Sequence, residues 1–256
     1  MSGTGSELVD YEAAAARYHG GRAIPTEGLD RWGTAVRAHL PVPDPDHGGP
    51  GGGRLRVLDL GAGTGIFAAA WPGWGATHVV AVEVTAAMIA ARQAPAPYVR
   101  AQAERLPLVA GSVDLVWAST SFHHFRDPAA AVAEIGRVLA PTGRVMIRTL
   151  LPELSRPGWI GVFPGRERAL ARCIGVDGFA DHFRPAGLGV VHVQEVPGRS
   201  TTFGEAADWV ERMRHADSLL TALTDREVAA GVRALRSAPD EPAGMDLSLV
   251  VLVRGA

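Results

Sequence analysis

The stretch from Val57 to Phe67 constrains the fold of this chain more than any other. It reads Val-Leu-Asp-Leu-Gly-Ala-Gly-Thr-Gly-Ile-Phe. The pattern predicts a buried strand at residues 55–60, a glycine loop at residues 61–65 and a helix that opens at Ile66. Because glycine has no Cβ, such a loop can adopt positive φ and let a ligand lie against bare backbone. A strand, a glycine loop and a helix in this order form the nucleotide-binding corner of a doubly wound α/β sheet.

The spacing of the glycines bears on which nucleotide this corner would bind. The dinucleotide fingerprint requires glycines spaced G-x-G-x-x-G, whereas here Gly65 comes one residue early and Ile66 occupies the expected place. Asp59 lies just before the loop, and a carboxylate there would repel a pyrophosphate but attract an ammonium group. A nucleoside that carries an amino acid therefore fits these residues better than one that carries phosphates.

The segment Leu58-Asp-Leu-Gly-Ala-Gly-Thr-Gly65 resembles the first motif of the class I S-adenosylmethionine-dependent methyltransferases. The similarity extends over residues 55–150 and is greatest to the methyltransferase type 11, ubiquinone-biosynthesis-like group. The resemblance implies S-adenosylmethionine as the cofactor. It implies that the loop region contributes these contacts to the cofactor: Asp59, Gly61, Ala62, Gly63 and Gly65.

An acidic residue ends the next predicted strand, His78 to Val84, about 20 residues past the glycine loop. A carboxylate at this place in the fold accepts hydrogen bonds from ribose hydroxyls, so Glu83 is the predicted ribose ligand. The segment Val84-Thr85-Ala-Ala-Met88 is similar to the family's Asp-x-Ser-x-x-Met pattern. The resemblance implies that Val84 and Met88 contact the cofactor, although a methionine on a helix can equally be a core residue.

The base of the nucleoside is expected beside the third predicted strand, Tyr98 to Ala103. Residues 101–108 resemble a family segment whose acidic residue accepts from the adenine amino group, and this chain has Gln102 there. An amide oxygen can accept the same bond without charge assistance. The resemblance also implies that the Ala103 N–H donates to an adenine ring nitrogen, and Glu104 completes this part of the predicted cofactor site.

The fourth predicted strand, residues 113–119, ends at Ser119, which is expected close to the reacting end of the cofactor. His123 and His124 follow, and an imidazole titrates near neutral pH, so they are the candidate general bases. Adjacent residues point in different directions, so at most one should face the cofactor; both could instead be structural. The nine histidines show no metal-binding spacing with cysteine or carboxylate residues, so no metal site is predicted.

The remaining segments and the composition bear on the domain organisation, the partners and the location of the protein. Residues 1–53 are expected to form an N-terminal helical lid and a Pro/Gly-rich linker, in which Tyr18 and Arg22 could reach the methionine carboxylate or belong to an ordinary surface helix. Residues 54–256 would form the methyltransferase domain, with residues 150–187 as a substrate cap. A net charge of −2 argues against nucleic-acid or membrane partners. One cysteine and no signal pattern predict a cytoplasmic protein. The expected oligomeric state is a monomer or a homodimer.

The predicted fold is α/β: a doubly wound seven-stranded sheet, mostly parallel with an antiparallel last strand, a Rossmann-like methyltransferase fold with helices on both faces. The predicted function is S-adenosylmethionine-dependent methyl transfer to a small-molecule acceptor by in-line displacement. One alternative is a protein of this fold that binds the cofactor without methyl transfer; another is an NAD-dependent oxidoreductase. The sequence does not identify the acceptor molecule or its reacting atom.

Overall fold

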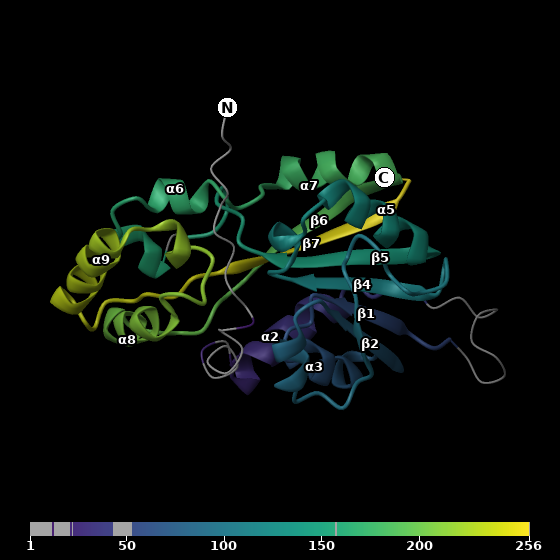
Figure 1. The fold of residues 1–256 in the computed structure, drawn as a ribbon, viewed down its shortest axis with the longest axis horizontal. Coiled ribbons are helices and arrows are strands. Elements are labelled where there is room, and N and C mark those ends of the chain that lie inside the picture. Colours follow the sequence, from purple (N-terminus) through teal and green to yellow (C-terminus); the bar gives the residue numbers. More distant parts are fainter. Residues whose placement is uncertain (1–11, 13–20, 22, 43–52, 157, 256) are drawn as a thin grey trace.

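The computed structural model describes residues 12, 21, 23–42, 53–156 and 158–255 of the 256-residue chain. These residues form a seven-stranded sheet with helices on both faces, and a helical lobe at one end of the sheet (Figure 1). The strand order is β3-β2-β1-β4-β5-β7-β6. The chain builds outward from the centre in both directions, which is the doubly wound arrangement that the sequence predicts.

The strands have the following bounds: β1 Arg56–Leu60, β2 His78–Glu83, β3 Tyr98–Arg100, β4 Val113–Ser119, β5 Leu139–Thr149, β6 Leu188–Val196 and β7 Leu247–Arg254. Neighbouring strands pair parallel except at β7, which pairs antiparallel with both β5 and β6. The prediction of a mostly parallel sheet with an antiparallel last strand is confirmed.

The central strands β1 and β4 are buried along nearly their whole length, because helices cover both of their faces. A partly buried ion pair joins β1 to β4 at their amino-terminal ends. The Arg56 guanidinium donates to both oxygens of the Asp114 carboxylate, from Nε at 2.9 Å and from Nη2 at 2.7 Å. This two-point contact fixes the position of β1, and hence of the loop that follows it.

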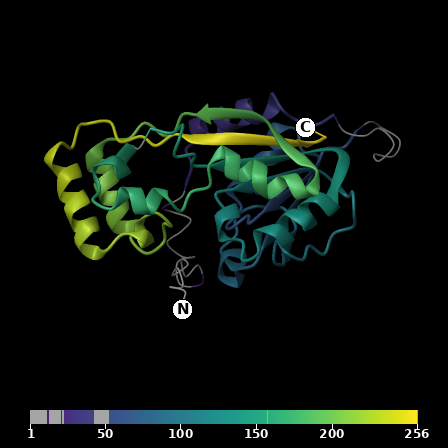
Figure 2. The ribbon, with the colours of Figure 1, turned by 90° about the horizontal axis from the view of Figure 1, so that it is seen from above.

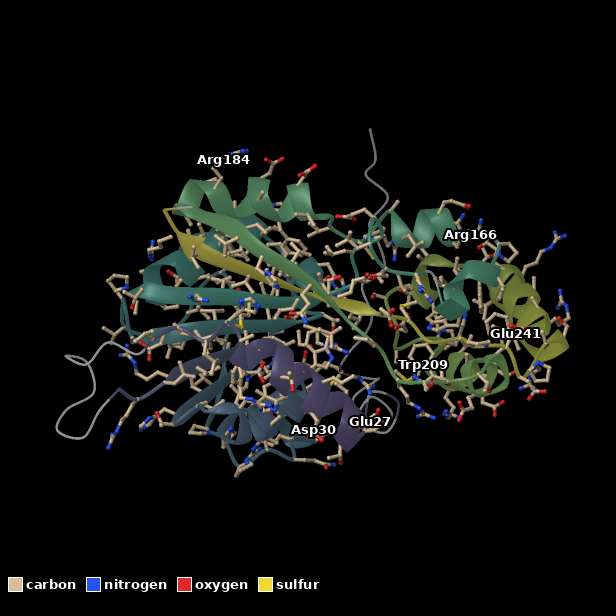
Figure 3. The ribbon with its side chains drawn as sticks, turned by 180° about the vertical axis from the view of Figure 1, so that it is seen from behind. Glu27, Asp30, Arg166, Arg184, Trp209 and Glu241 are labelled. Carbon is tan, nitrogen blue, oxygen red and sulfur yellow. The ribbon has the colours of Figure 1, made fainter. Side chains whose placement is uncertain are left out.

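Helices α2 (Thr26–Arg37) and α3 (Ile66–Trp74) pack on one face of the sheet through an aromatic cluster. Figure 3, the view from behind, shows α2 on the near side of the sheet, with Glu27 and Asp30 labelled. The cluster consists of Trp32, Phe67, Trp71, Trp74 and Trp117. The cluster joins both helices to Trp117 of β4.

Helices α5 (Pro128–Val138) and α7 (Val176–Phe183) cover the other face, with the 3₁₀ turns η2 (Phe122–His124) and η4 (Arg184–Ala186). The Asp127 carboxylate caps α5 by accepting from the Ala130 N–H at 3.0 Å. The sequence predicts a helix through Ala140, but α5 ends at Val138 and β5 begins at once. A proline at position 141 cannot continue a helix, which accounts for the early end.

The helical lobe has its own apolar core. It contains η3 (Gly158–Val162), α6 (Arg166–Leu170), α8 (Phe203–Met213), η5 (Leu220–Ala222) and α9 (Asp225–Ser237). Helices α8 and α9 each begin with a capping box, Thr202 with Glu205 and Thr224 with Glu227. Figure 2 shows the lobe beside the sheet when the molecule is seen from above, and Figure 3 labels Trp209 within it.

The range 150–187, expected from the sequence to be a substrate cap, is divided between two cores. Trp159, Ile160 and Phe163 belong to the lobe, whereas Phe179 and Phe183 are buried against the sheet. The cap function of this range stays a prediction, as do the predicted domain boundaries at residues 53 and 54. Among the residues described, no helix has the length and apolar character that crossing a membrane requires.

Candidate functional site

The glycine loop between β1 and α3 turns through three left-handed residues. Gly61, Gly63 and Gly65 have φ of 72°, 55° and 90°. The N–H groups of Gly61 and Ala62 both donate to the Val82 carbonyl of β2, at 2.8 and 3.1 Å. The loop is therefore anchored to the neighbouring strand, and its remaining backbone faces the carboxyl edge of the sheet.

Two of these glycines are required by close packing as well as by φ. A Cβ on Gly61 would lie 2.5 Å from the Ser121 Cβ, and a Cβ on Gly65 would overlap the Tyr98 hydroxyl. Ser121 cannot withdraw easily, because its hydroxyl donates to the Leu60 carbonyl at 2.8 Å. Gly61 therefore leaves room for Ser121, which follows β4, and Gly65 leaves room for Tyr98 of β3.

Glu83, at the carboxyl end of β2, holds the loop and the next turn together. Its carboxylate accepts from the Gly63 N–H at 2.9 Å and from the Thr85 N–H at 2.8 Å. Its side chain is buried, yet the residue lines a cavity. An ionised carboxylate has about four acceptor positions, so it can accept further hydrogen bonds from a molecule in that cavity.

The cavity lies over the carboxyl ends of β1, β2, β3 and β4. Of the sequence-predicted residues, the structure brings ten together on its wall: Gly61, Gly63, Glu83, Val84, Met88, Gln102, Ala103, Glu104, Ser119 and His124. Met88 comes from α4 (Ala86–Ala90), and it is both nearly buried and part of the wall. The core and cavity interpretations of this methionine are therefore compatible.

Four other predicted residues, all described, do not line the cavity: Asp59, Ala62, Gly65 and His123. Ala62 and Gly65 belong to the loop, but Ala62 packs against a small cluster that includes Ala81, and Gly65 lies beside Tyr98. Tyr18 and Arg22 fall outside the described residues. The cofactor contacts of all these residues stay predictions.

Asp59 lies beneath the loop with 1% of its surface exposed. The pKa of its carboxyl is raised to about 7, chiefly by burial and also by the neighbouring Glu83, while a hydrogen bond from the Ala68 N–H opposes the rise by stabilising the charged form. The pKa of the Tyr98 hydroxyl is likewise raised, mainly by burial and then by the nearby Asp59 and Glu83. Three acidic or weakly acidic groups thus converge behind the glycine loop.

The two candidate bases occupy a 3₁₀ turn after β4. The rings of His123 and His124 are 3.9 Å apart between centroids, at an interplanar angle of 49°. Only His124 lines the cavity, while His123 lies beside it within the turn. His124 is therefore the imidazole that can reach a bound molecule.

Eight residues of the wall were not among the predicted site residues: Leu60, Val82, Thr85, Ala101, Thr120, Ser121, Phe125 and Arg126. Thr120 has φ of 49°, and it is the single positive-φ residue other than glycine among the residues described. Its N–H donates to the Arg148 carbonyl at 2.7 Å. A β-branched residue in this region is a marked outlier, and nothing local in the sequence signals it.

The Arg148 side chain, near the carboxyl end of β5, contacts β4 and the aromatic cluster. It donates to the Ser119 hydroxyl at 3.2 Å and lies over the rings of Trp32 and Phe67, at 5.0 and 5.3 Å from their centroids. Arg148 thus connects the end of β4 with the aromatic cluster. Within the described part of the chain, no group of three potential ligands is placed to hold a metal ion.

Comparison with known proteins identifies the domain. Residues 58–147 match the family described as methyltransferase domain. A protein of Mycobacterium sp. (strain JLS), named an uncharacterized methyltransferase, is 34% identical over 182 residues, covering 70% of this chain and 65% of the relative. Malonyl-(acyl-carrier protein) O-methyltransferase of Enterobacter lignolyticus is 34% identical over 178 residues, covering 64% of this chain and 66% of that protein.

The chain thus spans just under two thirds of the length of these curated relatives. Among solved structures, the 4+2 cyclase SpnF has a TM-score of 0.62 at 18% identity, over 95% of this chain and 93% of that one. Identity this low shows a shared fold alone. The fold, the family match and the relatives agree: residues 58–147 belong to the methyltransferase domain family, and the chain has the Rossmann-like fold of class I S-adenosylmethionine-dependent methyltransferases.

Proposed function

We propose that this protein binds S-adenosylmethionine in the cavity above β1 to β4 and transfers its methyl group to a small-molecule acceptor. The observation that carries the proposal is the Glu83 carboxylate, which is buried, held by two backbone N–H groups and still open to the cavity. That carboxylate suits the two hydroxyls of a ribose. It lies against a glycine loop whose backbone is bare.

The remaining wall fits the rest of a nucleoside thioether. Val82, Met88 and Ala103 supply apolar surface for a base, and no cationic cradle for a pyrophosphate lines the loop side of the cavity among the described residues. The Glu83 carboxylate lies at the loop and lines the cavity. A negative charge there disfavours a diphosphate and favours a ligand with an ammonium and a sulfonium group.

S-adenosylmethionine supplies a methyl group already activated by the positive sulfur, so the protein's task is to hold acceptor and methyl in line. Ser119 ends β4 on the side toward β5, Thr120 follows it, and both line the cavity. His124 lies on the same wall and is the residue that would accept a proton from an acceptor hydroxyl or amine.

A cover over the acceptor is proposed for residues 1–53 and 150–187. Two described residues of the N-terminal region support it. The Glu12 carboxylate accepts from the Ala86 and Ala87 N–H groups at 3.0 and 3.1 Å, beside the cavity. The Gly21 carbonyl accepts from the Trp209 indole in the lobe at 2.7 Å.

Calorimetry with S-adenosylhomocysteine and with NADH tests the proposal. We expect one-site binding of S-adenosylhomocysteine and no heat with NADH. Incubation with a labelled methyl donor and metabolite fractions, followed by mass spectrometry, should then identify a methylated product. NADH binding that S-adenosylhomocysteine cannot displace would instead support the oxidoreductase alternative.

A second candidate is a protein of this fold that binds the cofactor without methyl transfer. The solved structure of a cyclase with the same fold shows that fold alone does not decide between them. Tight binding of S-adenosylhomocysteine with no labelled product from any fraction would favour this candidate.

A further inference from the structure

The order of the strands places the base of the ligand. With the ribose on Glu83 at the end of β2 and the glycine loop at the end of β1, the amino-acid end extends toward β4. The base must then extend the other way, toward β3, one strand spacing of about 4.8 Å further on. The segment that follows β3 supplies Gln102 and Ala103 to the cavity wall.

The Gln102 side chain is a polar group at this end of the cavity that makes no hydrogen bond to the described residues. The residue is exposed. A primary amide presents one acceptor oxygen and two donor hydrogens, and rotation exchanges their places. Gln102 can therefore meet either an amino or an oxo substituent on a base, whereas a carboxylate could only accept.

Two charged residues of the cavity wall, Glu104 and Arg126, bear on which substituent the base can carry. Glu104 also lines the cavity, but its Oε1 accepts from the N–H groups of Arg126 and Asp127 at 2.8 and 3.1 Å, which orients it toward that loop. The Arg126 guanidinium, also on the wall, has no ion pair or hydrogen bond within the described part of the chain. Arginine can only donate, and it pairs well with O6 and N7 of a 6-oxo purine.

We propose that Gln102 sets the base specificity of the cofactor site and that its amide makes the site tolerant of 6-oxo purine nucleosides. The inference rests on the proposed function, since it assumes a nucleoside thioether in this cavity. The inference predicts that the protein binds S-inosylhomocysteine nearly as well as S-adenosylhomocysteine. A carboxylate at position 102 would abolish that tolerance.

The two ligands differ at one more atom. N1 of a 6-oxo purine carries a hydrogen, so the Ala103 N–H that would donate to N1 of adenine loses its acceptor. This cost is common to the wild type and to every variant at position 102. It cancels when the ratio of the two dissociation constants in a variant is divided by the ratio in the wild type.

Calorimetry with the two ligands on four proteins tests the inference. Gln102→Asp makes the side chain an obligate acceptor, and Gln102→Ala removes it. Gln194→Asp makes the same chemical change at an exposed residue of β6, outside the cavity. Melting temperatures of all four proteins report whether the exposed substitutions leave the fold intact.

We expect wild type and Gln194→Asp to prefer the adenosyl ligand by less than about tenfold. Gln102→Asp should widen the preference by about 10- to 100-fold, the range for one hydrogen bond to a charged group. Gln102→Ala should weaken both ligands and keep the wild-type ratio within about threefold. A wild-type preference already above about 100-fold, or an unchanged ratio in Gln102→Asp, would overturn the inference but leave the proposed function standing. Failure of the wild type to bind either ligand would overturn both.

Discussion

The most direct prediction concerns Glu83→Ala. In the wild type the carboxylate uses two acceptor positions on the Gly63 and Thr85 N–H groups. The remaining positions face the cavity and are proposed to accept the ribose hydroxyls. Removing the side chain therefore removes the ribose contact and leaves two backbone donors without their acceptor.

The two consequences differ in size and in what reports them. Loss of the ribose contact should cost about 1.5–3 kcal/mol of binding free energy, the range for a hydrogen bond to a charged group, or about a 10- to 150-fold higher Kd for S-adenosylhomocysteine. Water can reach the half-buried Gly63, but Thr85 is buried. Its lost acceptor should lower the free energy of unfolding by about 1–3 kcal/mol.

Calorimetry with S-adenosylhomocysteine and its 3′-deoxy analogue separates the contact from a disturbed loop. The missing hydroxyl should weaken binding to the wild type and make little difference to Glu83→Ala, because the partner is already gone. Glu195→Ala, an exposed glutamate on β6, serves as the control. Equal affinities of wild type and Glu83→Ala, or the same loss with the analogue in both proteins, would refute the assignment of Glu83 to the ribose.

Three further predictions concern stability, measured by urea unfolding. Gly61→Ala adds a Cβ 2.5 Å from a serine Cβ, so it should cost at least about 2 kcal/mol more than Gly111→Ala, where φ is also positive but the space is open; equal costs would contradict the packing role. Burial raises the pKa of Asp59 from 3.8 to about 7, so the folded protein holds a proton that the unfolded chain releases within that window. The free energy of unfolding should fall as pH rises from about 4 to 7, by up to about 4 kcal/mol, and Asp59→Asn should remove that fall; an identical slope in wild type and variant would contradict it. Thr120→Gly should leave stability unchanged or raise it by up to about 1 kcal/mol, because it relieves a φ of 49°. Thr149→Gly, at the end of β5, should lower it.

The sheet could be predicted from the sequence because its signals are local. A parallel strand buried on both faces is a continuous apolar run, so the predicted bounds of β4, residues 113–119, coincide with those observed. The helices of the lobe begin at Thr202 and Thr224, whose side chains cap them.

The candidate site was predictable to the extent that it follows the strand ends. Carboxyl ends of parallel strands meet at one edge, so residues at the ends of β1, β2 and β4 and just after β3 had to converge. Which residue of a pair faces inward was not predictable. His124 and not His123 lines the cavity, because the turn after β4 is a 3₁₀ turn held against the sheet.

The sequence by itself determined the glycine loop, the acidic residue 20 positions later and the alternation of strands and helices, because each depends on neighbours in the chain. Only the tertiary structure decided that β7 lies between β5 and β6, and that the range 150–187 is shared between two cores. It alone put Thr120 in a left-handed conformation. These features arise from contacts between segments far apart in the chain, and no local pattern of residues encodes them.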